Sequence, residues 1–262
     1  MTDPRSAQRR RVESTRPRNR IGPHVASTTW RHGAFVHWPV DPAALEALLP
    51  GQLTLETYDG NAWIGVLPFV FVNAGLRGTP SLLRTAVAEL NVRTYVRWRE
   101  DPGVYFFRIE LGTPWLAAML GRTTRMPVEY ARMTVGAGED RVGFVSRTPA
   151  RPGTVGGTEG PDSPADVPAH FAITYEATGE PSRPEPGSLA HWLVERRRFF
   201  APSSGSMLVG EVSHEPWPLQ PATATIHENA LFEIEPLPRP EGEPIVHYCD
   251  DLEMTAAIPR RV

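Results

Sequence analysis

One eight-residue stretch constrains the fold more than any other part of the chain: residues 89–96, with the sequence ELNVRTYV. Polar and apolar residues alternate through it with a period of two, which is the period of a β-strand. One face of the predicted strand carries Glu89, Asn91, Arg93 and Tyr95, and the other carries Leu90, Val92, Thr94 and Val96. The polar face suits either a solvated outer surface or a polar pocket, and the alternation leaves both interpretations open.

The residues that follow predict a hairpin. Residues 100–103 (EDPG) form a turn signal, because proline presets φ and glycine accepts a positive φ. Residues 104–111 (VYFFRIEL) then read as a second strand. A four-residue loop would place Arg93 opposite Glu110 and Tyr95 opposite Arg108. Arg93 therefore has a plain alternative role, as the cross-strand ion-pair partner of Glu110.

The remainder of the chain reads as further strands with little helix. About nine or ten strand-like runs are separated by turn residues, which favours a mainly β fold, a barrel or a sandwich. Asp41 and Pro42 begin a short helix, and residues 114–120 suit one or two helical turns. One long helix is expected over about 189–200, before Pro202. Arg196 lies in its apolar stripe, so it either extends to solvent or meets a carboxylate beneath the helix.

Composition excludes several classes of protein. The 262 residues include no lysine and one cysteine, so neither a lysine Schiff base nor an intramolecular disulfide can form. No apolar run approaches the roughly 18 residues of a membrane span, and no secretory signal is recognisable, so a cytoplasmic protein is expected. Residues 1–20 contain seven arginines against Asp3 and Glu13. We expect a disordered arm over residues 1–24, more in keeping with a solvated tail than with a nucleic-acid-binding segment, followed by a single domain over 25–262.

Five motifs in order resemble the uncharacterised YqjF-like family, DUF2071. They are residues 35–40 (FVHWPV), 59–63 (DGNAW), 89–96 (ELNVRTYV), 102–106 (PGVYF) and 214–219 (HEPWPL). The resemblance covers roughly residues 28–258 and implies the acetoacetate-decarboxylase-like superfamily: an antiparallel β-barrel with an enclosed polar pocket, in a protein that commonly self-associates. The decarboxylases use a lysine Schiff base with a glutamate and an arginine, so the absence of lysine excludes that mechanism here. The chain also departs from its family at Arg197, where tyrosine is usual.

Candidate site residues follow from the strand face and the motifs. We predict Glu89 as the acid/base and Arg93 as the clamp for an anion, because this pairing suits a substrate carboxylate or enolate. His37 and His214 are candidate proton carriers, although a histidine bonded at a strand end is the plain alternative for each. Seven further residues are candidates for binding the substrate: Asn91, Tyr95, Trp38, Trp63, Tyr105, Arg196 and Trp217. No spacing suggests a metal site, and no cofactor is expected.

Three classes of function remain open on these grounds. The first is a lyase or isomerase that acts on an anionic or carbonyl-containing metabolite by acid/base chemistry without a Schiff base. The second is a ligand-binding or interaction module without turnover. A third, nucleic-acid binding through the basic arm, predicts an affinity that falls with salt.

Overall fold

The computed structural model describes residues 22–124, 126–139, 141–147, 170–203, 205–240 and 242–262. Most of the expected N-terminal arm therefore lies outside the described residues. The strands are β1 (His24–Val40), β2 (Thr54–Leu55), β3 (Ala62–Leu76), β4 (Thr85–Trp98), β5 (Asp101–Leu111), β6 (Val128–Tyr130), β7 (Arg132–Ala137), β8 (Val142–Arg147), β9 (Phe171–Ala177), β10 (Arg198–Ser203), β11 (Ser206–His214), β12 (Gln220–Asn229), β13 (Ile245–Ala257) and β14 (Arg260–Arg261). The helices are α2 (Pro42–Glu46), α3 (Pro114–Thr124), α4 (Leu189–Val194) and α5 (Leu231–Ile234), with a 3-10 turn η1 (Ser81–Leu83).

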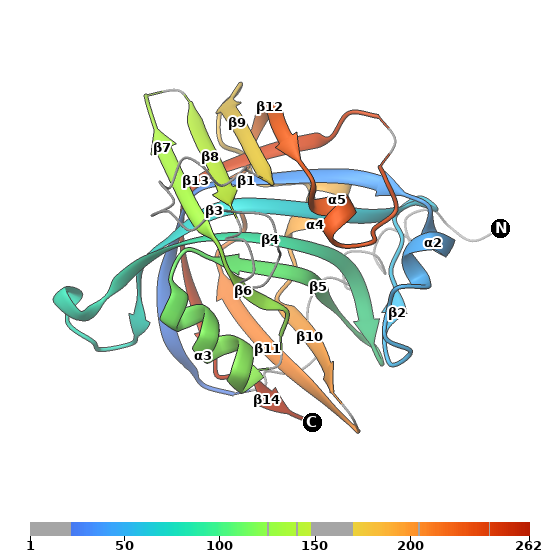
Figure 1. Ribbon diagram of the computed structural model, residues 1–262, viewed down its shortest axis with the longest axis horizontal. Helices are drawn as coiled ribbons and strands as arrows, with labels where there is room; N and C mark the ends of the chain where they lie inside the picture. Colours follow the sequence, from blue (N-terminus) through green and yellow to red (C-terminus); the bar gives the residue numbers. More distant parts are fainter. Residues whose placement is uncertain (1–21, 125, 140, 148–169, 204, 241) are drawn as a thin grey trace, which may run out of the picture.

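Seven strands close into a ring (Figure 1). Their order is β11-β10-β5-β4-β3-β1-β13, and β13 returns to pair with β11. The neighbours are antiparallel except β10 and β5, which run parallel. From β13 the sheet continues outside the ring through β12, β9, β8 and β7. The mainly β fold expected from the sequence is confirmed, as strands closed on themselves.

Two apolar clusters lie on the two sides of the ring wall. The interior cluster draws on strands all around the ring, and it includes Trp30, Phe35, Leu67, Phe69, Tyr95, Val104, Cys249 and Met254. The outer cluster lies between the ring and the β7–β8–β9–β12 layer, and it includes Val36, Ile64, Val92, Phe144, Phe171 and Ile173. Successive residues of β1, β3 and β4 pack alternately in the interior and the outer cluster. Both faces of β3 are therefore buried, which explains why both are apolar. The interior cluster is therefore a core enclosed by the ring.

Helix α3 covers part of the inner face of β4 and β5. Its Ala117 packs with Val87, Ile109 and Leu111. Val87 shares its face of β4 with Glu89, and Leu111 is paired directly opposite Glu89. The helix therefore lies on the same side of the sheet as the polar face predicted from residues 89–96.

The long helix expected over 189–200 is wrong in its second half. Helix α4 spans Leu189–Val194, and Arg198 begins strand β10. Phe199 and Phe200 pair with Gly210 and Val209 of β11, which completes the ring. Tertiary pairing has overridden a local pattern that is compatible with a helix. Helix α3, which was expected to end near residue 120, is longer, at 11 residues.

The predicted register of the β4–β5 hairpin is also wrong. Trp98 pairs with Asp101 across a tight turn, and Arg93 pairs with Phe106. A bulge then shifts the register, so that Val92 pairs with Arg108. One extra residue in a strand reverses which face the following side chains occupy. Arg108 consequently turns away from the polar face of β4, and the expected cross-strand pairs of Arg93 and Tyr95 do not form.

Gly210 permits the close approach of β10 and β11. A Cβ atom built on Gly210 would lie 1.9 Å from Cζ of Phe199. We expect Gly210→Ala to lower the free energy of unfolding by about 1–3 kcal/mol, because the ring of Phe199 must move within a packed interior. Urea denaturation measures this value. Gly136→Ala is the matched strand control, since a Cβ there meets no heavy atom within 4 Å; equal losses in both variants would contradict the argument.

Candidate functional site

The face of β4 that carries Glu89, Asn91, Arg93 and Tyr95 is turned into the ring. Tyr95, at one end of this face, is fully buried in the interior cluster. Val87, at the other end, contacts helix α3. The opposite face carries Leu90 and Val92, which pack in the outer cluster. Of the two interpretations left open by the alternation, the solvated outer surface is therefore excluded.

Glu89 is half-buried, and its carboxylate is held by a neighbouring amide. Asn91 Nδ2 donates to Oε1 of Glu89 at 3.0 Å. Burial raises the pKa of Glu89 from 4.5 to about 7, although the hydrogen bond from Asn91 and the charge of Arg93 act in the opposite direction. A carboxyl group with this pKa takes up and releases a proton near neutral pH.

Arg93 brings a positive charge to the same face. Within the described part of the chain, no carboxylate lies within ion-pair distance of Arg93. Its Nη2 donates to the carbonyl of Leu193 at 3.4 Å, at the C-terminal end of α4. Its Nε is buried without a hydrogen-bond partner. Buried donors without partners are costly, so this guanidinium retains capacity for an anionic ligand.

His37 and Tyr95 form a buried pair across the ring interior. The Tyr95 hydroxyl lies 2.7 Å from Nε2 of His37, and neither side chain is exposed. Burial, followed by the charge of Arg93 and the proximity of His247, lowers the pKa of His37 well below its usual value. The ring is therefore neutral, with one donor and one acceptor nitrogen. We assign the hydroxyl as donor to Nε2, which places the proton on Nδ1, a buried atom without a partner.

His214 lies against Trp217, and both approach the same interior. Their ring centroids are 4.6 Å apart, and Trp217 meets Phe35 edge-on at 4.8 Å. Phe35 in turn stacks on His37. Burial, then the charge of Arg197, lowers the pKa of His214 to about 3, with a further small effect from Arg93. Both predicted histidines therefore lie near Arg93 and are neutral at pH 7.

Arg196 is buried beneath helix α4, as one of the two sequence interpretations required. Its Nη1 is bonded to a carboxylate oxygen of Glu56, and its Nε donates to the carbonyl of Trp192 at 2.9 Å. The guanidinium also lies over the Tyr95 ring, 5.2 Å from the centroid. Arg196 therefore packs on the ring of Tyr95 and helps to fix its position.

The structure does not bring together all of the predicted substrate-binding residues. Trp63 lies in the interior cluster, and its indole N–H is buried without a partner. Trp38 belongs to the outer cluster and packs edge-on against Phe232. Tyr105 pairs with Thr94, and therefore lies on the face of the hairpin opposite to Tyr95. Trp38 and Tyr105 are thus placed away from Glu89 and Arg93.

His247 is an interior residue that the sequence reasoning did not select. It pairs with Phe35 across β1 and β13, and burial lowers its pKa. Its Nδ1, like that of His37, is buried without a hydrogen-bond partner. The alternation of His247 and Cys249 on one strand face is a signal that could have identified it. Burial raises the pKa of Cys249 to about 12, so this thiol is unreactive at neutral pH.

Glu195 is a second residue that was missed, and it fixes the segment that carries His214. One carboxylate oxygen of Glu195 accepts from the backbone N–H of Trp217 at 2.9 Å, and the other accepts from Arg197 at 2.7 Å. Arg197 also donates to the carbonyl of His214 at 2.6 Å. No sequence signal links these residues, because the contact joins the end of α4 to a segment about 20 residues later.

Neither a cluster of metal ligands nor a membrane-spanning helix is found among the described residues. In the described ranges, no group of three or more His, Cys, Asp or Glu side chains lies close enough to bind a metal ion. No helix in the same ranges is both long and apolar enough to cross a lipid bilayer. The polar atoms gathered at Glu89, Arg93 and His37 consist of one proton acceptor, one fixed cation and neutral donors, a set that suits an anionic carbonyl compound.

The ring of strands gives the chain the fold that is found in acetoacetate-decarboxylase-like enzymes. The enduracididine biosynthesis enzyme MppR, complexed with pyruvate, matches with a TM-score of 0.61 at 13% identity, over 93% of this chain and 92% of the other. An acetoacetate decarboxylase-like enzyme from Sphingomonas wittichii RW1 matches with a TM-score of 0.58 at 15% identity, over 92% and 94%. Acetoacetate decarboxylase from Legionella pneumophila gives 0.54 at 13% identity, over 93% and 92%.

By its sequence the chain belongs to the DUF2071 family. The family model, described as an uncharacterised conserved protein, matches residues 27–253. The uncharacterised protein YqjF of Bacillus subtilis (strain 168) is 34% identical over 228 residues, which is 86% of this chain and 87% of YqjF. The resemblance carried by the five motifs is confirmed.

Proposed function

We propose that the protein is an enzyme that binds a small anionic carbonyl compound inside the ring and transfers a proton on it without a Schiff base, as an isomerase or lyase does. The observation that carries the proposal is Glu89, a carboxyl group with a pKa of about 7 near Arg93, which has no carboxylate within ion-pair distance among the described residues. General acid/base catalysis is most efficient when the pKa of the group lies near the working pH.

The roles of the residues follow from their charges. Arg93 binds the carboxylate of the ligand, and Glu89 removes a proton from the carbon next to the carbonyl group. The electrons of the broken C–H bond form the C=C bond of an enolate, and the carbonyl oxygen takes the negative charge. His37 donates to that oxygen through Nδ1–H, while Tyr95 holds its other nitrogen. If the proton on Glu89 is first replaced by one from solvent and then returned to the same carbon, the result is hydrogen exchange; if Glu89 protonates a different carbon, the result is an isomerisation.

Exchange of carbon-bound hydrogen tests this proposal directly. Pyruvate is the first probe, since the structurally similar MppR binds it; other 2-oxo and 3-oxo acids follow. We expect the protein to accelerate deuterium incorporation at the pyruvate methyl group in D2O, measured by proton NMR. The rate rises as pH increases through about 7, because the base must be ionised. Glu89→Gln lowers it at least about 100-fold.

Matched variants separate catalysis from binding. Arg93→Met should weaken pyruvate binding in calorimetry, whereas Glu89→Gln should retain it. Glu233→Gln and Arg239→Met are the controls, because these residues form an exposed ion pair elsewhere. Binding without exchange of any oxo acid would favour the non-catalytic ligand-binding module. Equal exchange in Glu89→Gln and the parent would contradict the proposal.

A further inference from the structure

Two phenylalanines that face the ring interior beside Arg93 are only half-buried. Phe106 of β5 pairs directly with Arg93 of β4, so the two side chains lie next to each other on the inner face of the sheet. Phe199 of β10 lies against Phe106, with ring centroids 5.8 Å apart. Both rings pack against the interior cluster, yet both keep accessible surface. Their chain neighbours Val104 and Phe200 are 4% and 1% exposed, so the accessible apolar surface in these two strands lies at the aromatic pair.

The pairing of the ring wall is interrupted at this aromatic pair. Strands β10 and β5 run parallel and share one paired position, Phe199 with Val104. On the same edge of β5, the pairing with β6 begins at Ile109. Phe106 lies between these two positions, where this edge of β5 has no strand partner within the described ranges. Its ring packs against both the interior cluster and the cluster beneath helix α3. The aromatic pair therefore lies at a break in the wall, next to the polar site.

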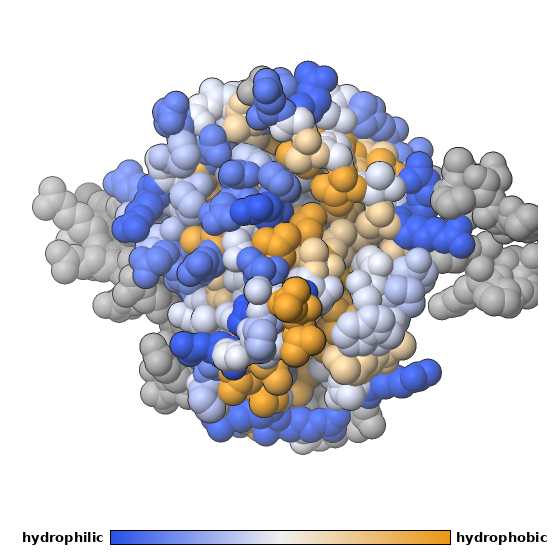
Figure 2. All heavy atoms as spheres, turned by 90° about the vertical axis from the view of Figure 1, so that its left-hand side faces the viewer, coloured by the Kyte–Doolittle hydropathy of each residue, from blue (hydrophilic) through white to orange (hydrophobic). Residues whose placement is uncertain are grey.

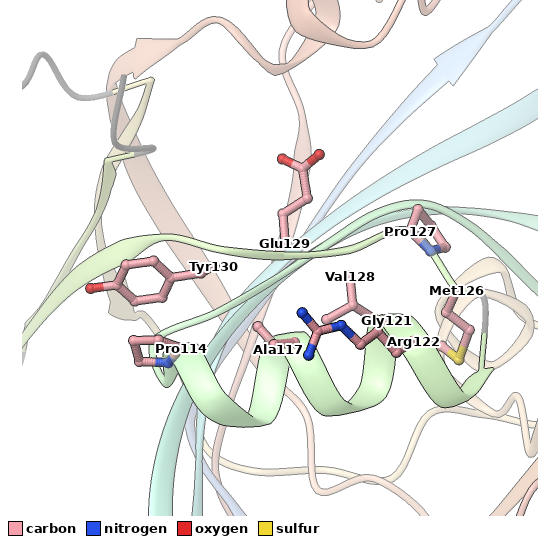
Figure 3. A pocket seen from close by; sticks show the side chains of 10 residues that line it. Pro114, Ala117, Gly121, Arg122, Met126, Pro127, Val128, Glu129 and Tyr130 are labelled. Atoms are coloured by element: carbon pink, nitrogen blue, oxygen red, sulfur yellow. The ribbon is translucent and has the colours of Figure 1, made fainter. Parts of the chain in front are cut away.

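The apolar groove on the outer surface is a different feature. It lies between helix α3 and strand β6 and has a volume of about 460 Å³ (Figure 3). Figure 2, which views the side of the molecule at the left of Figure 1, shows further apolar side chains gathered near the centre of that face. The residues that line the groove include Ala117 and Tyr130, but not Glu89, Arg93 or Phe106. The accessible surface of the aromatic pair is therefore not part of this groove.

On its other side, toward β3, Arg93 has little free space beside it. Gly65 of β3 pairs with Arg93, opposite to Phe106. A Cβ atom built on Gly65 would lie 3.0 Å from Cδ2 and Nε2 of His37 and 3.1 Å from Cδ1 of Leu67. Even a methyl group would be crowded there, so this side of Arg93 suits only a compact group such as a carboxylate. A bulky substituent on the ligand must therefore extend toward β5 and Phe106.

We propose that the ligand is a 2-oxo acid with an aryl group on the carbon next to the carbonyl, and that this aryl group packs against Phe106 and Phe199. The inference rests on the proposed function, because it places the carboxylate on Arg93 and the reacting C–H bond at Glu89. Sites for small molecules combine apolar and aromatic walls with a few polar groups that fix the orientation. Aromatic rings favour offset or edge-to-face contacts, which two accessible phenylalanine rings offer to a third. An aryl group at this carbon also conjugates with the C=C bond of the enolate.

Calorimetric binding of four 2-oxo acids to the full chain tests the proposal. The acids are phenylpyruvate, 4-methyl-2-oxopentanoate, 2-oxoglutarate and pyruvate. We expect phenylpyruvate to bind at least about 10-fold more tightly than the other three, because only its substituent is a ring that can pack on Phe106 and Phe199. The comparison uses the parent protein alone, so it does not depend on the folding of any variant.

Variants of two adjacent phenylalanines locate the aryl group. Phe106→Ala should weaken the binding of phenylpyruvate at least about 10-fold and that of pyruvate less than about 3-fold, because pyruvate has no group that reaches this ring. Phe107→Ala is the matched control. Phe107 is the next residue and is also half-buried, but it packs in the outer cluster and against Tyr105, at 5.3 Å between ring centroids. It should bind all four acids as the parent does. Far-UV circular dichroism and melting temperature establish that both variants are folded.

The outcomes separate this inference from the proposed function. If phenylpyruvate binds no more tightly than pyruvate or 4-methyl-2-oxopentanoate, or if Phe106→Ala and Phe107→Ala weaken it equally, the aryl site is overturned, whereas exchange of carbon-bound hydrogen in pyruvate would still support proton transfer. If phenylpyruvate binds tightly and Phe106→Ala alone weakens it, the aryl site is supported, even where no hydrogen exchange follows and the proposed proton transfer fails. If none of the four acids binds, both proposals are overturned.

Discussion

Glu110→Gln is expected to lower the free energy of unfolding by about 3 kcal/mol at pH 7. Glu110 has no exposed surface, and its carboxylate accepts from Arg108 Nε at 2.6 Å, His170 Nε2 at 2.8 Å and Ser146 Oγ at 2.6 Å. Removing one partner of a buried ion pair leaves the other charge uncompensated, which costs about 3–5 kcal/mol. Arg108 keeps two other carboxylate partners, so we expect the lower end. Chemical denaturation measures the loss, and the melting temperature should fall by about 6–12 °C.

The control and the pH dependence make this prediction specific. Glu129→Gln removes another partner of Arg108, but its carboxylate is 44% exposed, so less than about 1 kcal/mol should be lost. Burial opposes ionisation of Glu110, yet the hydrogen bond and charge of His170, then Arg108, hold its pKa below the usual value. Its stabilising effect is therefore complete above pH 4.5 and is lost as pH falls through the lowered pKa. Equal losses from both variants would show that burial is not the cause.

The fold was predictable wherever one strand face is apolar. The alternation in residues 89–96 correctly placed four polar side chains on one face, because the period of a strand is fixed by its backbone. Asp41 and Pro42 correctly begin helix α2, where Oδ1 of Asp41 accepts from the N–H of Ala43 at 3.0 Å. Local geometry decides such features, so the local sequence is sufficient to predict them.

The wrong predictions concern features that are fixed by pairing between residues far apart in the sequence. The bulge that turns Arg108 and Glu110 out of the polar face has no signature in the local sequence. Glu110, the expected partner of Arg93, therefore lies on the opposite face, and Arg93 pairs with Phe106. The helix expected past residue 194 gave way to β10, because the ring requires a strand beside β11. The shared strand face made Glu89 and Arg93 candidates from the sequence, whereas His247 and Glu195 are brought near them by other strands and loops. Contacts between residues far apart in the sequence can be seen only in the structure.

Glu89→Gln is expected to stabilise the protein at pH 8 and to have little effect at pH 5. Burial raises the pKa of Glu89 from 4.5 to about 7, so between these values the folded state holds a proton that the unfolded state has released. Stability therefore falls as pH rises through this window. At about 1.4 kcal/mol per pKa unit the shift corresponds to about 3 kcal/mol, which the half-buried position of Glu89 reduces to about 2.

The glutamine variant removes that ionisation, so the parent and the variant should differ by about 2 kcal/mol at pH 8 in urea denaturation. At pH 5 Glu89 is protonated in the folded state, and glutamine resembles the neutral acid in size and in accepting from Asn91. Glu233→Gln, at an exposed carboxylate, should show no such pH-dependent gain. A Glu89→Gln effect that is equal at pH 5 and pH 8 would contradict the raised pKa. A variant that gains stability while losing proton exchange would show that the buried carboxylate is kept at a cost in stability, because the chemistry requires a group that ionises near neutral pH.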